Sequence, residues 1–211
     1  MFKGINKVIK TYIYWDFVIN SAWGLLGPVF AIFIVQNIAV SNIMQAAKIA
    51  GFSALSYWLA KSILQIPIGH YLDKNHGEKD DFWFAVTGTI LTGLVPFGYL
   101  VSFLPWHIYL CQIIHAFGMS MVVPATYAIF VRHVDKGREA YECSLDSTLL
   151  GIGVGITGAV GGIMAGYLGF QAIFIFTGSF TILSAFMFFF IHGEMTKKIT
   201  QPHEIPPSRP F

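Results

Sequence analysis

Two long stretches of this chain contain no Asp, Glu, Lys or Arg, and they restrict the fold more than any other feature. The first stretch spans the 50 residues 82–131 and the second the 47 residues 147–193. A helix crosses the hydrocarbon core of a bilayer in about 20 residues, so each stretch is long enough for two crossings. Turn-forming residues divide both stretches, at Leu104-Pro105-Trp106 and at Gly166–Gly169. The sequence therefore predicts an all-α membrane protein with several crossings.

The composition agrees with this fold class and excludes several functions. Charged residues make up 11% of the chain, against about 25% in a soluble domain, and the mean hydropathy is +0.63. The chain has no metal-ligand spacing, no phosphate-binding glycine loop and no catalytic motif. We therefore expect no cofactor, no metal site, no enzymatic activity and no nucleic-acid partner.

Six membrane-spanning helices fit the hydropathy pattern, in one bundle over residues 1–195. The predicted spans are about 12–35, 49–72, 82–104, 106–131, 144–165 and 170–192. An even number of spans places both termini on one side, and 11 of the 13 basic residues fall on that side. By the positive-inside rule both termini are predicted to be cytoplasmic, in a bacterial-type inner membrane. The polar, proline-containing residues 196–211 are expected to form a disordered cytoplasmic tail.

The two halves of the chain share short patterns. Pro28–Phe33 resembles Pro124–Phe130, the pair Tyr71-Leu72 recurs as Tyr167-Leu168, and Phe84–Gly88 resembles Phe174–Gly178. Each match alone is weak, but their order relates the first span to the fourth, the second to the fifth and the third to the sixth. This order favours two three-helix repeats, and an odd number of spans per repeat makes the second copy inverted.

Two segments resemble motifs of the major facilitator superfamily, and the resemblance covers residues 10–195. The loop Gly69-His-Tyr-Leu-Asp73-Lys74-Asn-His-Gly77 is similar to the superfamily's loop signature, with one extra residue before Gly77. The glycine-rich fifth span resembles a signature of the superfamily's antiporters, although the usual proline is missing. The resemblance implies a fold equivalent to one six-helix half of such a transporter.

Members of that superfamily usually hold their solute between two six-helix halves. A chain that supplies one half is expected to form a homodimer with its two-fold axis along the membrane normal. A different partner chain is the alternative. Glycines on one face of the fifth span are candidates for this contact, because bare helix faces approach closely, or they pack within the same bundle. These glycines are Gly151, Gly155, Gly158 and Gly162.

Lys61 is the most informative single residue of the predicted spans. A lysine near the middle of the bilayer costs at least ~2.5–3.5 kcal/mol if it faces lipid, so it is expected to face a cavity or a buried ion-pair partner. Tyr57 and Gln65 lie on the same face of the second span, and Asp16 is the candidate partner.

The resemblance implies that the first and fourth helices line the solute cavity. The candidate binding and coupling residues are Asp16, Asn20, Trp23, Tyr57, Lys61, Gln65, Gln112 and His115. His115 either contacts solute or protons, or it makes a structural hydrogen bond. Protonation of Asp16, alternating with a Lys61 contact, would couple transport to H+. A carrier of a sugar or other polar metabolite without proton coupling is the alternative.

By the same resemblance, charged residues at the cytoplasmic ends form a gate, although solvated loops would explain many of them individually. The candidate gate residues are Gly69, Asp73, Lys74, Gly77, Arg132, Arg138 and Asp146. Together these features predict a secondary active transporter of a small solute that works as a homodimer by alternating access. A half-transporter or assembly subunit that pairs with a different chain is the remaining alternative.

Overall fold

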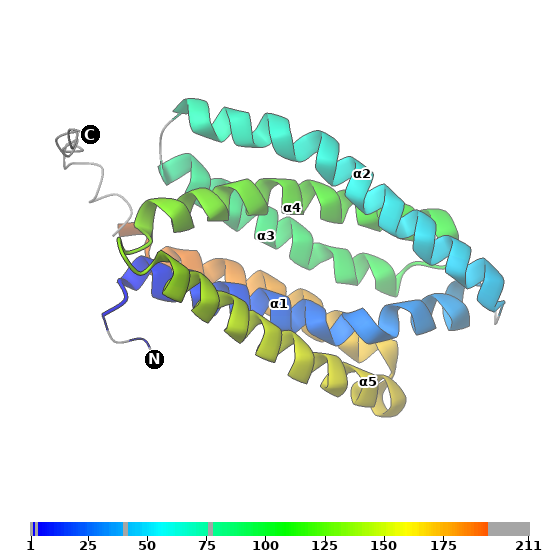
Figure 1. The fold of residues 1–211 in the computed structure, drawn as a ribbon. Coiled ribbons are helices and arrows are strands. Elements are labelled where there is room, and N and C mark those ends of the chain that lie inside the picture. Colours follow the sequence, from blue (N-terminus) through cyan, green and yellow to red (C-terminus); the bar gives the residue numbers. More distant parts are fainter. Residues whose placement is uncertain (1, 3, 40–41, 76–77, 194–211) are drawn as a thin grey trace, which may run out of the picture.

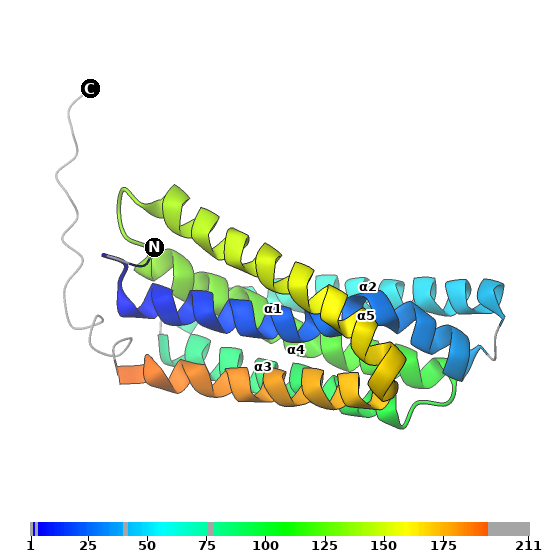
Figure 2. The same ribbon diagram turned by 90° about the horizontal axis from the view of Figure 1, so that it is seen from below.

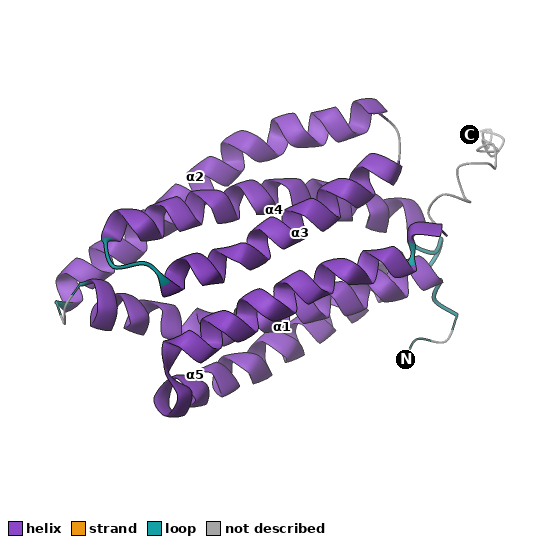
Figure 3. Cartoon of the chain, turned by 180° about the vertical axis from the view of Figure 1, so that it is seen from behind, coloured by secondary structure: helices purple, strands orange, loops and turns teal. Residues whose placement is uncertain are grey.

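The computed structural model describes residues 2, 4–39, 42–75 and 78–193, and these residues contain helices and short loops but no strand (Figure 3). Figure 1 shows the helices lying roughly along one direction, in a single bundle. The elements are α1 (Lys7–Phe33), the π-helical η1 (Ile34–Ile38), α2 (Ile43–Asn75), α3 (Glu78–Leu100), α4 (Pro105–His133), α5 (Glu139–Ala185) and the 3-10 helix η2 (Phe186–Phe190).

Helix α5 turns back on itself at Gly169. This residue has φ 75° and ψ 172°, a backbone conformation that glycine adopts far more readily than other residues. Figure 2 shows the two parts running in opposite directions, which we call the first arm (139–168) and the second arm (170–185). The turn falls at the Gly166–Gly169 break predicted from the sequence.

Four helical segments are long and apolar enough to cross a membrane: Lys7–Ile38, Glu78–Leu100, Pro105–His133 and Glu139–Phe190. Helix α2 has 33 residues but is not among them. Each predicted span overlaps a helix or an arm of α5, and their ends differ by up to seven residues. The count of six crossings nevertheless stays a prediction.

The helices pack in an order that leaves α1 and α4 apart. Helix α1 packs along both arms of α5, whereas α4 packs on α2 and α3. Helix α3 also packs on the second arm, where Gly93 and Gly178 meet closely. Because α1 and α4 touch each other only sparsely, they leave space for the pocket described below.

Close contact between α1 and the first arm depends on glycines other than the predicted ones. A Cβ atom built at Gly161 would overlap the carbonyl oxygen of Leu25 and lie 2.8 Å from its carbonyl carbon. Gly153 similarly faces the side chains of Phe17 and Ser21. The bundle thus uses a second glycine face of this helix for its internal packing.

The predicted glycine face is mostly open in the structure. A Cβ at Gly151, Gly155 or Gly162 would meet no atom within 4 Å, while one at Gly158 would lie 3.6 Å from Pro28 Cγ. Of these four residues, only Gly158 therefore takes part in close packing within the bundle.

Asn6 joins the start of α1 to the loop between α4 and α5. Its side-chain oxygen accepts a hydrogen bond from the backbone N–H of Ile9 at 2.9 Å and caps the helix. Its amide nitrogen donates to the His133 carbonyl at 2.6 Å and to Asp135 Oδ1 at 3.1 Å. These bonds, with the Asn6 side chain donating, hold the pKa of Asp135 below its ordinary value.

We expect Asn6→Ala to lower the free energy of unfolding by about 1–2 kcal/mol, because the cap and both loop contacts are lost. A depressed carboxyl pKa stabilises the fold above the unfolded pKa of about 3.9 and ceases to do so as the pH falls through the folded value. The loss should therefore shrink in acid. Thermal unfolding in detergent at neutral and acidic pH measures both effects. Asn6→Ser, which keeps the cap but not the side-chain bond to Asp135, should keep part of the stability and weaken the pH dependence.

Candidate functional site

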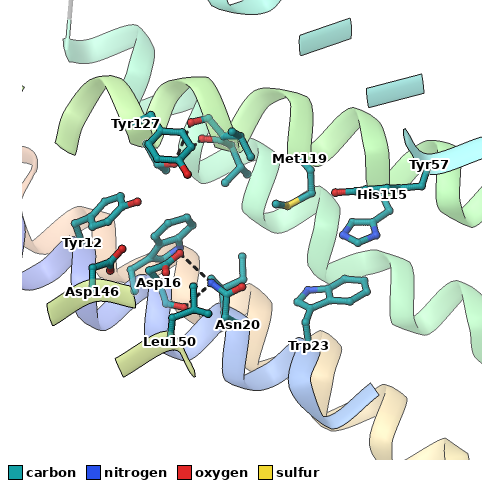
Figure 4. Close-up of a pocket in the computed structure, with 15 residues that line it drawn as sticks. Tyr12, Asp16, Asn20, Trp23, Tyr57, His115, Met119, Tyr127, Asp146 and Leu150 are labelled. Carbon is teal, nitrogen blue, oxygen red and sulfur yellow. Dashed lines mark hydrogen bonds between the residues drawn. The ribbon is translucent and has the colours of Figure 1, made fainter. Parts of the chain in front are cut away.

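A pocket of about 370 Å³ lies between α1 and α4 (Figure 4). Helix α2 and the first arm of α5 flank it, whereas α3 and the second arm contribute no lining residue. Its polar and aromatic lining consists of Tyr12, Trp15, Asp16, Asn20, Trp23, Tyr57, His115, Thr126, Tyr127 and Asp146.

Helix α1 supplies Asp16, Asn20 and Trp23 from one face, because residues three and four positions apart are neighbours on a helix. The side-chain amide of Asn20 donates to the Asp16 backbone oxygen at 2.8 Å and to Asp16 Oδ1 at 2.9 Å. The first bond anchors the Asn20 amide on the helix backbone, and the second orients the Asp16 carboxylate within the pocket.

Aromatic contacts beside the pocket connect α1, α2 and α4. The Trp23 and His115 rings stack with centroids 4.0 Å apart and 8° between their planes. The Tyr57 ring lies 4.8 Å from His115 and joins α2 to the group. Trp23, Tyr57 and His115 also line a second pocket of about 260 Å³, to which Gln112 belongs. The three rings therefore stand between two cavities.

Asp146 lies in the pocket, although the sequence assigned it to the cytoplasmic gate. Figure 4 shows its carboxylate, from α5, beside that of Asp16 from α1. Among the described residues, Asp146 Oδ1 and the indole nitrogens of Trp15 and Trp23 are buried without a hydrogen-bond partner. Three pocket-lining residues thus each keep one buried polar atom that the described structure leaves unsatisfied.

A sequence model of the Major Facilitator Superfamily matches residues 17–210, which is most of the chain. The chain belongs to the Major Facilitator Superfamily. It is also similar to an uncharacterized MFS-type transporter of Methanocaldococcus jannaschii, with 26% identity over 162 residues. The match covers 77% of this chain and 39% of that relative, so the chain spans well under half of the relative's length.

Membership of the Major Facilitator Superfamily makes this an integral membrane protein of a transporter family rather than an enzyme family. The described residues contain no group of three or more His, Cys, Asp or Glu side chains that could hold a metal ion. The pocket is a candidate site for a small solute.

Two predicted cavity residues of this superfamily member, Lys61 and Gln65, line neither pocket. Lys61 Nζ lies 5.6 Å from the centroid of the Tyr57 ring and 5.1 Å from that of Trp58. Within the described part of the chain Lys61 forms no ion pair with Asp16. The physical reason is that α2 packs on α4 and barely touches α1.

The predicted gate residues are spread over one end of the molecule. Arg132, near the end of α4, forms an ion pair with the fully buried Asp81 of α3. Beside this pair, His133 Nε2 lies 3.4 Å from Glu78 Oε1. Helices α3 and α4 are thus held together at this end by two adjacent side-chain pairs.

Three of the remaining gate candidates lie at the surface. Asp73, Lys74 and Arg138 are exposed. Gly69 faces Pro124, and a Cβ atom built at Gly69 would lie 3.7 Å from Pro124 Cβ. Gly77 lies outside the described residues, as does the predicted tail. The structure therefore groups Arg132 with Asp81 rather than with Asp73.

Sequence reasoning missed Tyr12, Trp15 and Tyr127 as pocket residues. Trp15 and Tyr12 are 2% and 5% exposed, and their rings pack with centroids 5.9 Å apart. Aromatic residues are common both in cores and at membrane interfaces, so residue type alone gave no signal. Tyr12 and Asp16 are four positions apart, and this spacing was the available clue.

Proposed function

We propose that the chain is a secondary active transporter of a small solute that works by alternating access with a second six-helix bundle. In the simplest arrangement that bundle is a second copy of this chain. The observation that carries the proposal is the pocket between α1 and α4, which is walled by one bundle and bounded at its sides by α2 and α5. A facing bundle would complete the cavity and provide the body against which the first one rocks.

The open glycine face supports such a pairing. Gly151, Gly155 and Gly162 leave bare backbone on the outside of the first arm. A helix surface that faces only lipid gains nothing from glycine, whereas a helix–helix contact in the membrane does. The first arm flanks the pocket, so a contact along this face would bring the partner bundle to the site.

The packing order supports two inverted repeats and six crossings. Helix α1 packs on the first arm of α5 as α4 packs on α2, and α3 packs on α4 as the second arm packs on α1. The start of α1, the end of α2, the start of α3 and the α4–α5 loop lie at the same end in Figure 1. Because basic residues gather at that end, we propose that it is cytoplasmic, in a bacterial-type inner membrane.

Proton coupling is the form of energy input that the pocket favours. Asp16, Asp146 and His115 are side chains whose charge changes on proton binding, and all three line the pocket. Uncoupled transport of a sugar or other polar metabolite is the second candidate, because Asn20, Gln112 and Trp23 are also present. Pairing with a different chain is the third, since this chain covers only 39% of its transporter relative.

Alternating access can be tested without knowing the solute. Met119 lines the pocket from α4, and Cys111 and Cys143 are the two native cysteines. We expect Met119→Cys, with both native cysteines replaced by alanine, to react with an impermeant maleimide applied to either side of a proteoliposome. Reaction from one side only would contradict alternating access.

Native mass spectrometry, together with the same labelling assay, tests the pairing surface. Gly155→Leu fills an open position on the first arm without a clash inside the bundle. If the glycine face carries the second bundle, the leucine should separate the two, and native mass spectrometry should show a single 23.4 kDa chain. An unchanged particle mass and unchanged two-sided labelling would exclude this face as the contact.

A further inference from the structure

The charges of the pocket narrow the class of solute. Its lining contains two carboxylates, from Asp16 and Asp146, and no Lys or Arg. The two lie side by side in Figure 4, close enough to interact electrostatically. Lys61, the basic residue on the neighbouring part of α2, lies outside the lining with its ammonium group over the Trp58 ring. The pocket is therefore negatively charged when both carboxylates are ionised.

These carboxylates differ in what compensates them. Asp16 Oδ1 accepts a hydrogen bond from Asn20, whereas Asp146 Oδ1 is buried without a partner among the described residues. A buried anionic oxygen without a partner is costly, and the cost disappears when a cation or a proton binds. The pair consequently favours a positively charged ligand.

Aromatic rings provide the second line of argument. Tyr12, Trp15 and Tyr127 line the pocket together with the carboxylates, and aromatic faces attract organic cations. The Trp15 side chain is 2% exposed, and its indole N–H has no partner in the described structure. The aromatic lining is independent of the acidic pair and favours an organic cation.

Other solute classes fit less well. An anion would meet two like charges, and a neutral sugar would satisfy hydrogen bonds but leave the charge of the pair uncompensated. A cavity of about 370 Å³ lies at the lower end of the range for sites that bind drug-sized ligands. It can accommodate a small amine or quaternary ammonium compound.

We propose that the transported solute is an organic cation, with its ammonium group between Asp16 and Asp146 and its apolar part against Tyr12, Trp15 and Tyr127. This inference rests on the proposed transport function, because it names the solute class of the same pocket. Protons that neutralise the two carboxylates would exchange with the cation at the same place.

Equilibrium dialysis of the purified protein in detergent tests the proposal with three probes of different charge. They are benzyltrimethylammonium, methyl glucoside and phenylacetate. We expect the cation alone to bind, and Asp146→Asn and Asp16→Asn each to weaken its binding about tenfold or more. Asp146→Glu keeps the charge and should retain binding. Glu139→Gln, an exposed neutralisation two turns earlier on α5, is the matched control and should change nothing.

Each outcome of the dialysis either supports or overturns the proposed solute class. Preferential binding of the glucoside or of phenylacetate would overturn the proposal, as would cation binding that both asparagine variants leave intact in normally folded protein. The maleimide assay needs no solute, so the two proposals fail separately. Two-sided labelling without cation binding overturns the solute class alone, and cation binding with one-sided labelling overturns alternating access alone.

Discussion

Gly161→Ala is expected to destabilise the bundle by about 3 kcal/mol, the upper part of the range for overpacking a well-packed core. The added methyl group would overlap the Leu25 carbonyl oxygen and lie within 3 Å of two further Leu25 backbone atoms. Backbone cannot move aside as a side-chain end can, so α1 and the first arm would have to separate. Thermal unfolding in detergent measures the loss.

A glycine outside this contact and outside the proposed pairing face provides the control. A Cβ at Gly51, in α2, meets no atom within 4 Å, so Gly51→Ala should leave stability unchanged or raise it by up to about 1 kcal/mol through helix propensity. Equal effects of the two substitutions would show that α1 does not pack on the Gly161 face.

Arg132→Ala is expected to cost about 3 kcal/mol, because it leaves a buried carboxylate without its partner. The Asp81 side chain is fully buried and the Arg132 side chain is 33% exposed, so the desolvated member is the carboxylate. The loss should appear as a lower unfolding temperature and as looser packing where α3 meets α4.

Two variants distinguish the effect of losing this ion pair from the effect of losing any positive charge. Lys136→Ala removes a basic residue from the adjacent loop and should change stability by no more than about 0.5 kcal/mol. Asp81→Ala combined with Arg132→Ala should be less damaging than Arg132→Ala alone, because no unpaired buried charge remains. A double variant as unstable as the sum of its single variants would refute the coupling.

The helices and their breaks were within reach of the sequence because they depend on local properties. Uncharged stretches of about 50 residues cannot stay in water, and only a few residues within them can turn the chain. The structure accordingly reverses at 101–104, just before Pro105, and at Gly169. Asp16, Asn20 and Trp23 line one pocket for the same reason, since their spacing alone puts them on one face of α1.

Positions that depend on which helix packs where were harder to predict. Asp16 was the candidate partner of Lys61, but α2 packs on α4 and barely touches α1. Asp146 was assigned to the cytoplasmic gate because it lies near the start of α5. That helix runs alongside α1, however, and this brings Asp146 beside Asp16.

The glycines of α5 show the same limit. They lie on two faces of one helix, and the regular spacing of Gly151, Gly155, Gly158 and Gly162 identified only one of them. The structure packs α1 against Gly153 and Gly161, on the other face. Spacing identifies bare faces, but the identity of the neighbour on each face comes from the tertiary structure.

The aromatic group of Trp23, Tyr57 and His115 has a consequence for the dimensions of the solute. These rings line both the cavity of about 370 Å³ and the one of about 260 Å³, so the two cavities adjoin at the rings. A short solute would fit within one cavity, whereas a longer one would have to bend around the stacked rings or part them. We therefore expect the Trp23–His115 stack to limit the length of the solute that the pocket accepts.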